Sequence, residues 1–327
     1  MGQERLLLDI LSDGRFHSGE MLATQLGGVS RTAIWKGIRV LQTFGLEIHA
    51  VRGRGYRLAE PLELLAADRI QAALADSARS WVSGIEVHER LDSTNTHLLH
   101  RAQDGLPGGW VCLAEYQSAG RGRRGRAWVS PFAANLYLSL LWRFTLEAAL
   151  LSGLSLAVGV ALLRTLTGMG ISELGLKWPN DVLWRRHKLA GVLLEFGGES
   201  SGPCHIVAGI GLNVAMPRNA ECTIDQPWVD LRSIVGPGQL SRNRLAARLI
   251  SELVNAFIQF EQAGFAPFRE DWARYDLARD RPVTLQLPTT TLSGIARGVD
   301  AAGALLLETA TGIRPFLGGE ISLRLSS

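Results

Sequence analysis

The segment from Gly120 to Arg126 reads Gly-Arg-Gly-Arg-Arg-Gly-Arg, so three glycines and four arginines fall within seven residues. Glycine lets the backbone approach a ligand closely and present its N–H groups. Arginine offers a planar fork of hydrogen-bond donors that matches carboxylate and phosphate. We name this segment the arginine loop and predict that it binds an anion or a nucleotide. A solvated face or a nucleic-acid-binding tail remains open as an alternative.

A second cluster, Lys177-Trp178-Pro179-Asn180-Asp181, follows an apolar stretch. Proline cannot donate to a strand ladder, so the strand should end there and leave Asn180 and Asp181 at a defined turn. Lys177 is suited to phosphates, and Asp181 is suited to Mg²⁺ or to an incoming ammonium group. An ordinary Asn-Asp turn between strands is the competing interpretation.

Two further segments place small residues beside a cation or an amide. Lys188 opens the run Lys-Leu-Ala-Gly, in which Gly191 leaves room for a ligand against a strand, although an isolated strand-end lysine is more often solvated. The run Gly209–Asn213 has glycines at i and i+2, which clears one face of a strand for a flat ring or chain. It lacks the GxGxxG pattern, so a Rossmann dinucleotide site is not supported.

Two common catalytic motifs are missing from the sequence. It contains no P-loop and no HExxH helix. His97 and His100 have no evident third ligand, and the cysteines Cys112, Cys204 and Cys222 lack CxxC spacing, so neither a zinc site nor a disulfide framework is expected. A site rich in cations and backbone donors remains, and it suits the attack of a carboxylate on an α-phosphate.

The first 60 residues predict three short helices and a strand–turn–strand wing. Ser18 and Ser30 are expected to cap the second and third helices, and Arg52–Gly55 to form the turn of the wing. From Ser30 to Arg57, six basic residues accompany one acidic residue, a local charge of +5 that suits phosphate neutralisation. The residues predicted to contact DNA are Ser30, Arg31, Thr32, Trp35, Lys36, Arg39, Arg52 and Arg54. A solvated protein-interaction face is the alternative.

The length of 327 residues, with 46% hydrophobic and 20% charged residues, predicts two or three folded domains. We predict an α+β protein: a winged helix-turn-helix domain over residues 1–62, a mixed catalytic domain built on a sheet over 66–275, and a small SH3-like β-barrel over 278–327. The expected strands are Val111–Tyr116, Leu136–Trp142, Leu174–Trp184, Lys188–Phe196, His205–Val214, Val283–Leu287, Ala304–Glu308 and Glu320–Leu325. The expected later helices are Asn95–Gln103, Leu150–Leu166 and Arg244–Gln262.

The composition gives no reason to expect a membrane protein. The uncharged, mostly apolar stretch Ala148–Leu163 has 16 residues and indicates a buried helix, because a membrane span needs about 20 apolar residues. No signal-peptide pattern opens the chain. We therefore expect a cytoplasmic protein that does not bind membranes.

Taken together, these segments resemble those of the bacterial biotin–protein ligases. The matching segments, in the family's order, are Asp92–Asn95, Gln117–Arg126, Lys177–Asp181, Lys188–Gly191 and Gly209–Asn213. The winged head and the ending Gly318–Arg324 are similar to the bifunctional subgroup, which also represses the biotin operon. The resemblance covers essentially the whole chain.

That resemblance implies a reaction in two steps. Biotin and MgATP form biotinoyl-5′-AMP and pyrophosphate, and the biotinoyl group then passes to a lysine of the biotin carboxyl carrier protein of acetyl-CoA carboxylase. The residues implied to bind biotin are Ser93, Thr94, Asn95, Gln117, Arg121, Gly122, Arg123, Lys188 and Gly191. Those implied to bind ATP or the adenylate are Arg121, Arg123, Arg126, Trp128, Asn180, Lys188, Asn213 and Trp228. Those implied to be catalytic are Lys188, Arg123, Lys177 and Asp181. The resemblance implies no intrinsic metal; Mg²⁺ would arrive with ATP and lie near Asp181.

The bifunctional subgroup further implies binding to biotin-operon operator DNA. Biotinoyl-5′-AMP would be the corepressor, and the adenylate-bound protein would be a homodimer. Two departures from the family pattern bear on the preferred DNA sequence: Gly27-Gly28 adds a residue to the turn before the third helix, and Trp35 is a bulky residue on that helix. The adenine contacts are expected within residues 214–230.

Three other functions remain open on the sequence alone. A ligand-responsive transcription factor would bind biotin or its adenylate without turnover. A lipoate or other acyl–protein ligase shares the reaction logic, but the DNA-binding head and the full arginine loop disfavour it. An RNA-binding protein would need exposed aromatic stacking residues along the arginine loop.

Overall fold

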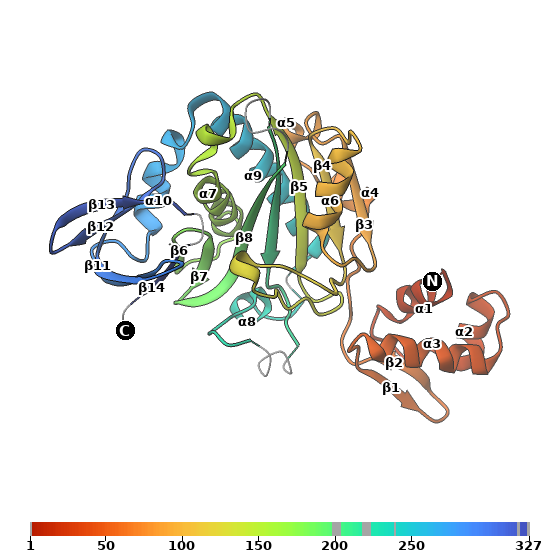
Figure 1. Cartoon of the computed structure of the whole chain (residues 1–327). Helices are drawn as coiled ribbons and strands as arrows, with labels where there is room; N and C mark the ends of the chain where they lie inside the picture. Colours follow the sequence, from red (N-terminus) through yellow and green to blue (C-terminus); the bar gives the residue numbers. More distant parts are fainter. Residues whose placement is uncertain (1, 198–203, 218–223, 239, 319–320, 326–327) are drawn as a thin grey trace.

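The computed structural model describes residues 2–197, 204–217, 224–238, 240–318 and 321–325. They form an N-terminal head, a central body around a large sheet and a C-terminal sheet (Figure 1). The head contains α1 (Gly2–Leu11), α2 (Gly19–Gln25) and α3 (Arg31–Thr43), followed by the antiparallel wing strands β1 (Ile48–Val51) and β2 (Gly55–Leu58). The predicted winged helix-turn-helix is confirmed.

Local signals in the sequence define the helices of the head. The Ser18 hydroxyl accepts a hydrogen bond from the Met21 amide at 3.1 Å, and the Ser30 hydroxyl accepts one from the Ala33 amide at 3.2 Å. Both predicted N-caps are confirmed. The pair Gly27-Gly28 follows α2 with φ of +83° and +82°, a left-handed conformation that suits glycine and ends the helix.

A seven-stranded sheet forms the body, in the order β3-β4-β5-β9-β8-β7-β6. The strands are β3 (Gly84–His88), β4 (Trp110–Ala114), β5 (Leu136–Phe144), β6 (Leu174–Lys177), β7 (Asp181–Trp184), β8 (His187–Gly197) and β9 (Cys204–Leu212). The β3–β4 pair is parallel, and the other five neighbouring pairs are antiparallel.

Helices cover both faces of this sheet (Figure 1). On one face lie α7 (Leu154–Thr167) and α9 (Arg242–Ala263), with α4 (Ala67–Ala72) and α5 (Asp76–Arg79) beside α9. On the other face α6 (Thr94–Gln103) packs on β4, β5 and β9, where Cys112, Leu141 and Val207 point toward it. Across the described part of the chain, no helix is long and apolar enough to cross a membrane.

Two element predictions are wrong in detail. The expected strand Leu174–Trp184 is a hairpin of β6 and β7. The predicted end of the strand before Pro179 and the turn at Asn180 are confirmed, whereas Asp181, also expected in the turn, begins β7. The expected helix Leu150–Leu166 is interrupted at Gly153, whose φ of +81° separates a short 3₁₀ turn (Ala148–Leu151) from α7. Glycine adopts this left-handed conformation readily.

The C-terminal unit is a five-stranded antiparallel sheet in the order β13-β12-β11-β10-β14. Its strands are β10 (Pro282–Gln286), β11 (Thr291–Val299), β12 (Leu305–Thr309), β13 (Gly312–Phe316) and β14 (Ser322–Leu325). Within residues 240–318 and 321–325, β13 and β14 do not pair, so closure into a barrel stays a prediction. The first residue of the predicted strand Glu320–Leu325 lies outside the described residues.

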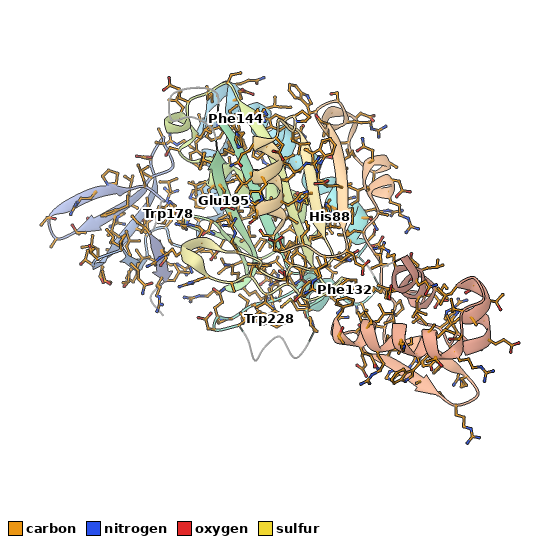
Figure 2. The ribbon with its side chains drawn as sticks, turned by 45° about the vertical axis from the view of Figure 1, so that its right-hand side comes forward. His88, Phe132, Phe144, Trp178, Glu195 and Trp228 are labelled. Atoms are coloured by element: carbon orange, nitrogen blue, oxygen red, sulfur yellow. The ribbon has the colours of Figure 1, made fainter. Side chains whose placement is uncertain are left out.

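Short elements connect the body to its neighbours. These are α8 (Leu231–Val235), a 3₁₀ turn (Ala266–Phe268) and α10 (Arg269–Tyr275). The head packs on the body through an aromatic pair, in which Phe44 follows α3 and Phe132 follows the arginine loop. Their rings stack with centroids 5.1 Å apart, and Phe132 belongs to the buried cluster of the head. Figure 2 shows Phe132 at this junction.

Candidate active site

A cavity of about 610 Å³ lies at one end of the central sheet. It is bounded by the N-terminus of α6, the arginine loop between β4 and β5, the β6–β7 turn, the first half of β8 and the end of β9. Every residue expected to bind biotin, ATP or the adenylate, or to be catalytic, lines it: Ser93, Thr94, Asn95, Gln117, Arg121, Gly122, Arg123, Arg126, Trp128, Lys177, Asn180, Asp181, Lys188, Gly191, Asn213 and Trp228. Segments far apart in the sequence therefore meet here.

The glycines of β8 and β9 clear space for a ring, as predicted, but the ring belongs to the chain itself. Gly191 and Gly211 are cross-strand partners. A Cβ on Gly211 would lie 2.3 Å from Trp128, and one on Gly191 would lie 3.1 Å from it. The Trp128 indole thus lies flat against this glycine pair and forms one wall of the cavity. Gly209 plays the same part for Asn95, since a Cβ there would lie 2.2 Å from Asn95 Oδ1.

We expect Gly211→Ala to displace the Trp128 indole and to destabilise the protein by about 1–3 kcal/mol, the usual cost of overpacking. Thermal unfolding with and without biotin and ATP would measure both the stability and the ligand-induced shift. Gly159→Ala on α7 is the matched control, because its Cβ would meet Leu176 at an ordinary 3.5 Å. Equal melting behaviour of the two variants would contradict this account of the wall.

Lys188 has an ion-pair partner within the cavity. Its Nζ lies 2.8 Å from Asp181 Oδ1 and 5.4 Å from the centroid of the Trp128 ring. Both charged side chains are largely buried, with 18% and 14% of their surface exposed. Low exposure weakens solvent screening, so the Lys188 ammonium can act strongly on any anion placed beside it.

Lys177 is a second buried cation of the cavity. Burial lowers the pKa of its ammonium group, and the nearby cations Lys188 and Arg126 act in the same direction, while Asp181 opposes them. With Arg324, four cations surround one carboxylate, which is electrostatically unfavourable unless an anion joins them. This arrangement favours binding of a polyanion such as a triphosphate.

Arg123 connects the arginine loop to two other parts of the chain. Its guanidinium donates to Asn180 Oδ1 at 3.0 Å, and to the carbonyl oxygens of Gly318 at 3.0 Å and Ile321 at 2.9 Å. Burial lowers the pKa of this guanidinium, although arginine remains charged. Arg124, with φ of +58°, donates to Ser322 Oγ at 3.0 Å. The C-terminal sheet therefore anchors the arginine loop.

The C-terminal contribution to the cavity was not expected from the sequence. Ser322, Leu323 and Arg324 of β14 line the cavity. The segment Gly318–Arg324 carried only a family resemblance, and its sequence contains no spacing that points to a site 200 residues upstream. Pairing of β14 with β10 brings it there.

A chain of polar side chains runs from the exposed Arg121 inward to buried Asn95, Ser139 and Thr94. The Arg121 guanidinium donates to Glu195 Oε2 at 2.8 Å, and the Asn95 amide donates to the same oxygen at 2.8 Å (Figure 2 labels Glu195). The Ser139 hydroxyl lies 2.6 Å from Asn95 Oδ1 and 2.7 Å from Thr94 Oγ1. Glu195 and Ser139 were missed because each lies inside a strand with no accompanying motif.

The chain continues through the first turn of α6. Gln117 Oε1 accepts from the Thr94 amide at 2.9 Å and from its hydroxyl at 3.2 Å, while Gln117 Nε2 donates to Ser130 Oγ at 3.2 Å. Ser93 caps α6, since its hydroxyl accepts from the Thr96 amide at 3.4 Å. Thus the start of α6, which supplies Ser93–Asn95, is held by Gln117 from the segment that precedes the arginine loop.

Asn213 and Trp228 lie on the remaining side of the cavity. The Asn213 amide donates to the carbonyl oxygens of Val229 at 3.1 Å and Lys188 at 3.4 Å. A parallel bridge pairs Lys188 with Trp228, supported by a hydrogen bond from the Lys188 amide to Pro227 O at 2.9 Å. Asn213 therefore holds the Trp228 segment in place; residues 218–223 of the predicted adenine side lie outside the described residues.

In the head, α3 and the wing strands β1 and β2 lie close together (Figure 1) and carry the residues predicted to contact DNA. The residues exposed there are Arg31, Thr32, Trp35, Lys36, Arg39, Arg52 and Arg54. Trp35 is 54% exposed and lies under the Arg39 guanidinium, while Arg54 stacks over Phe16. Ser30 differs from the others, because its hydroxyl serves as the cap of α3.

Comparison with known proteins matches each part of the chain to a family. Residues 87–213 match the Biotin/lipoate A/B protein ligase family, residues 280–324 the Biotin protein ligase C terminal domain, and residues 3–57 an HTH domain. The chain is 46% identical to the bifunctional ligase/repressor BirA of Salmonella typhimurium, over 97% of this chain and 96% of that protein. It is 37% identical to the biotin–[acetyl-CoA-carboxylase] ligase of Mycobacterium tuberculosis, over 68% of this chain and 83% of that protein.

A solved structure is also similar. The biotin protein ligase from Aquifex aeolicus in complex with biotin and ATP superimposes with a TM-score of 0.63 at 27% identity, covering 75% of this chain and all of that chain.

Proposed function

The chain belongs to the family of bifunctional biotin–protein ligases and repressors, and we propose that it uses ATP to attach biotin to a carrier-protein lysine and represses the biotin operon through its head. The observation that carries the proposal is the common cavity in which the arginine loop, Lys188 and the start of α6 meet. It offers cations for a carboxylate and a triphosphate, and a neutral polar corner for an uncharged head group.

In the first step a carboxylate oxygen of biotin attacks the α-phosphorus of ATP. The new O–P bond forms as the bond to the β-phosphate breaks, and pyrophosphate leaves. We propose that Lys188 stabilises the negative charge that develops between the biotin carboxylate and the α-phosphate. Lys177 and Arg126 would bind the phosphates that leave as pyrophosphate. Preorganised cations in a buried site stabilise such developing charge without reorganisation. Mg²⁺ enters as part of the substrate MgATP.

The other cavity residues bind the two substrates in this proposal. Ser93, Thr94 and Gln117 receive the biotin head, supported by their position at the buried polar end of the cavity. Asn213 and the Trp228 segment receive the adenine. Arg121 and Arg123 keep the arginine loop closed over the adenylate, supported by their bonds to Glu195 and to the C-terminal segment. Closure keeps water from the mixed anhydride.

In the second step the amine of a carrier lysine attacks the carbonyl carbon of biotinoyl-5′-AMP. An amide bond forms, the C–O bond to phosphate breaks, AMP leaves and the attacking nitrogen loses a proton. Asp181 is assigned to orient the amine of the incoming lysine. Because Asp181 is paired with Lys188 at 2.8 Å, the two residues would exchange partners between the steps.

Incubation of the protein with biotin, MgATP and the carrier domain of acetyl-CoA carboxylase tests the ligase. Intact mass of the carrier should increase by one biotinoyl group, and a carrier whose acceptor lysine is replaced by arginine should not change. A parallel incubation with lipoate in place of biotin distinguishes a biotin–protein ligase from the alternative, a lipoate or other acyl–protein ligase. A carrier of unchanged mass in the biotin arm, or preferential lipoylation, would overturn the proposal.

For the head, we expect Arg31→Ala to weaken binding to biotin-operon promoter DNA and to reduce the slope of log K against log salt by about 1, because one phosphate contact is lost. Fluorescence anisotropy at several salt concentrations measures this slope. Arg248→Ala, an exposed arginine on α9, is the control. Identical slopes for the wild type and both variants would remove Arg31 from the DNA surface.

We also propose that biotinoyl-5′-AMP is the corepressor and promotes a homodimer, which the family resemblance supports. Sedimentation velocity with and without biotin and ATP should then show a larger species only in their presence. A gel shift under the same two conditions should show tighter DNA binding with both substrates. Ligand-independent association would contradict the corepressor role.

A further inference from the structure

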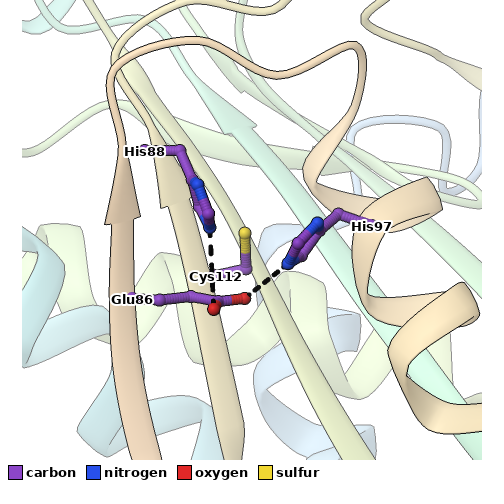
Figure 3. Close-up of side chains that lie close together, drawn as sticks. All are labelled: Glu86, His88, His97 and Cys112. Atoms are coloured by element: carbon purple, nitrogen blue, oxygen red, sulfur yellow. Dashed lines mark hydrogen bonds and ion pairs between the residues drawn. The ribbon is translucent and has the colours of Figure 1, made fainter. Parts of the chain in front are cut away.

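Four metal-ligating side chains meet between α6 and the strands β3 and β4 (Figure 3). Glu86 and His88 come from β3, Cys112 from β4 and His97 from α6. One ligand atom of each lies within 4.8 Å of the corresponding atoms of the other three. None of the four lines the cavity of the proposed ligase site.

The arrangement follows from the sheet. Glu86 and His88 lie at positions i and i+2 of β3, so both side chains point to one face. Glu86 is the register partner of Cys112 on the neighbouring parallel strand, which places the thiol on the same face. The helix α6 packs over this face and brings His97 down onto Glu86, with His97 Nε2 2.8 Å from Glu86 Oε1.

We propose that Glu86, His88, His97 and Cys112 form a binding site for a transition metal of the zinc class. Two imidazoles, a thiolate and a carboxylate are the donor types that such ions take, whereas Mg²⁺ and Ca²⁺ prefer oxygen alone. Tetrahedral bonds of about 2.0–2.3 Å place ligand atoms roughly 3.3–3.8 Å apart. The donor atoms here lie within 4.8 Å of one another, so the widest pairs would have to close, while the His97–Glu86 pair at 2.8 Å would have to open.

A buried, unpartnered nitrogen supports this assignment. His88 Nε2 is shielded from solvent and has no hydrogen-bond partner within the described residues, although it lies 3.6 Å from Glu86 Oε2. The rings of His88 and His97 have centroids 4.8 Å apart and are inclined at 60°, so their nitrogens converge on the carboxylate instead of stacking. A bound cation would satisfy all three groups together.

Two features of the cluster oppose metal binding: the Arg101 guanidinium beside Glu86 and the raised pKa of the Cys112 thiol. Arg101 Nη1 lies 3.4 Å from Glu86 Oε2 on the more exposed side of the cluster. Burial and the Glu86 carboxylate raise the pKa of the Cys112 thiol, so coordination requires the metal to displace the thiol proton. The inner position of Cys112, fully buried under α6, makes the thiolate a ligand that external thiols cannot replace.

The site would join an edge strand to the helix that opens the cavity. β3 is the outermost strand of the sheet, and His97 follows Asn95 by about half a turn on α6. A metal held by both elements would fix the start of α6 without contacting the substrates. Its role would be structural, and its loss should be visible in stability independently of ligase activity.

Titration of the metal-free full chain with Co²⁺ tests the proposal, because cobalt reports its ligands by absorption. We expect one Co²⁺ per chain, visible ligand-field bands of a tetrahedral site, and a thiolate-to-cobalt charge-transfer band in the near ultraviolet. Zn²⁺ should displace the cobalt and bleach these bands. The melting temperature should rise on metal addition in the absence of ATP.

Matched variants decide which residues hold the metal. Cys112→Ser should lose the charge-transfer band, whereas Cys204→Ser, at the other buried cysteine, should keep it. His97→Gln should weaken binding more than about tenfold, since even outer-shell changes cost metal sites 10–100-fold; His100→Gln, exposed on the same helix, should not. A wild-type spectrum without the thiolate band, or equal binding by His97→Gln and His100→Gln, would overturn the site.

Discussion

Replacement of Lys188 by alanine is expected to slow the formation of biotinoyl-5′-AMP by about a hundredfold, because removal of one preorganised donor to developing charge costs about 3 kcal/mol of barrier. The ammonium is held 2.8 Å from Asp181 and over the Trp128 ring. Single-turnover release of pyrophosphate measures this step. When preformed biotinoyl-5′-AMP is supplied, the rate of biotinoyl transfer to the carrier should fall less than the rate of adenylate formation.

The sequence offers a natural control for this experiment. The chain has three lysines, Lys36, Lys177 and Lys188, and two of them line the cavity. Lys36→Ala in the head should leave adenylate formation unchanged. Because Lys188→Ala also leaves Asp181 without its cation, the double variant with Asp181→Asn separates loss of catalysis from a buried unpaired charge. Adenylate formation at the wild-type rate in Lys188→Ala would refute the assignment.

Replacement of Arg123 by glycine is expected to release biotinoyl-5′-AMP about ten- to a hundredfold faster. The guanidinium holds the arginine loop to Asn180 and to two carbonyl groups near β14, and hydrogen bonds to charged groups each contribute about 1.5–3 kcal/mol. The escaped adenylate should label lysines of bystander proteins. A chase experiment measures release, and blotting of added serum albumin for biotin measures labelling.

Arg124→Gly is the matched control for this release. Arg124 has a left-handed φ that glycine adopts easily, and its substitution removes the bond to Ser322 while sparing those of Arg123. We expect a much smaller change in release. Self-labelling should be slight in either variant, because Lys36 is the one lysine outside the cavity. Equal retention by Arg123→Gly and the wild type would contradict the proposed closure.

The predictable features were those encoded by neighbouring residues. Ser18 and Ser30 predict where their helices begin, because an N-cap depends on the next three residues alone. The arginine loop and the Lys177–Asp181 turn were recognisable because their chemistry is contiguous. Their convergence on one cavity followed from family resemblance, and the sheet order accounts for it in physical terms.

Features that depend on pairing between distant strands were not predictable. Glu195 and Ser139 look like ordinary strand residues until β8 and β5 are placed under α6. The glycines of β9 signalled a cleared face, but only the structure identifies Trp128 as the ring that occupies it. For the same reason, the spacing of Glu86, His88, His97 and Cys112 gave no sign of a cluster drawn from three elements.

The hydrogen-bond chain from Arg121 through Glu195, Asn95 and Ser139 to Thr94 and Gln117 has a consequence for how this site is dissected. Groups linked in this way polarise and orient one another, so single substitutions do not measure independent quantities. Removing Arg121 and removing Gln117 should each disturb the same intermediate residues. Their combined cost should therefore fall short of the sum, and a double-mutant cycle between the two ends would measure the coupling free energy that the connecting residues transmit.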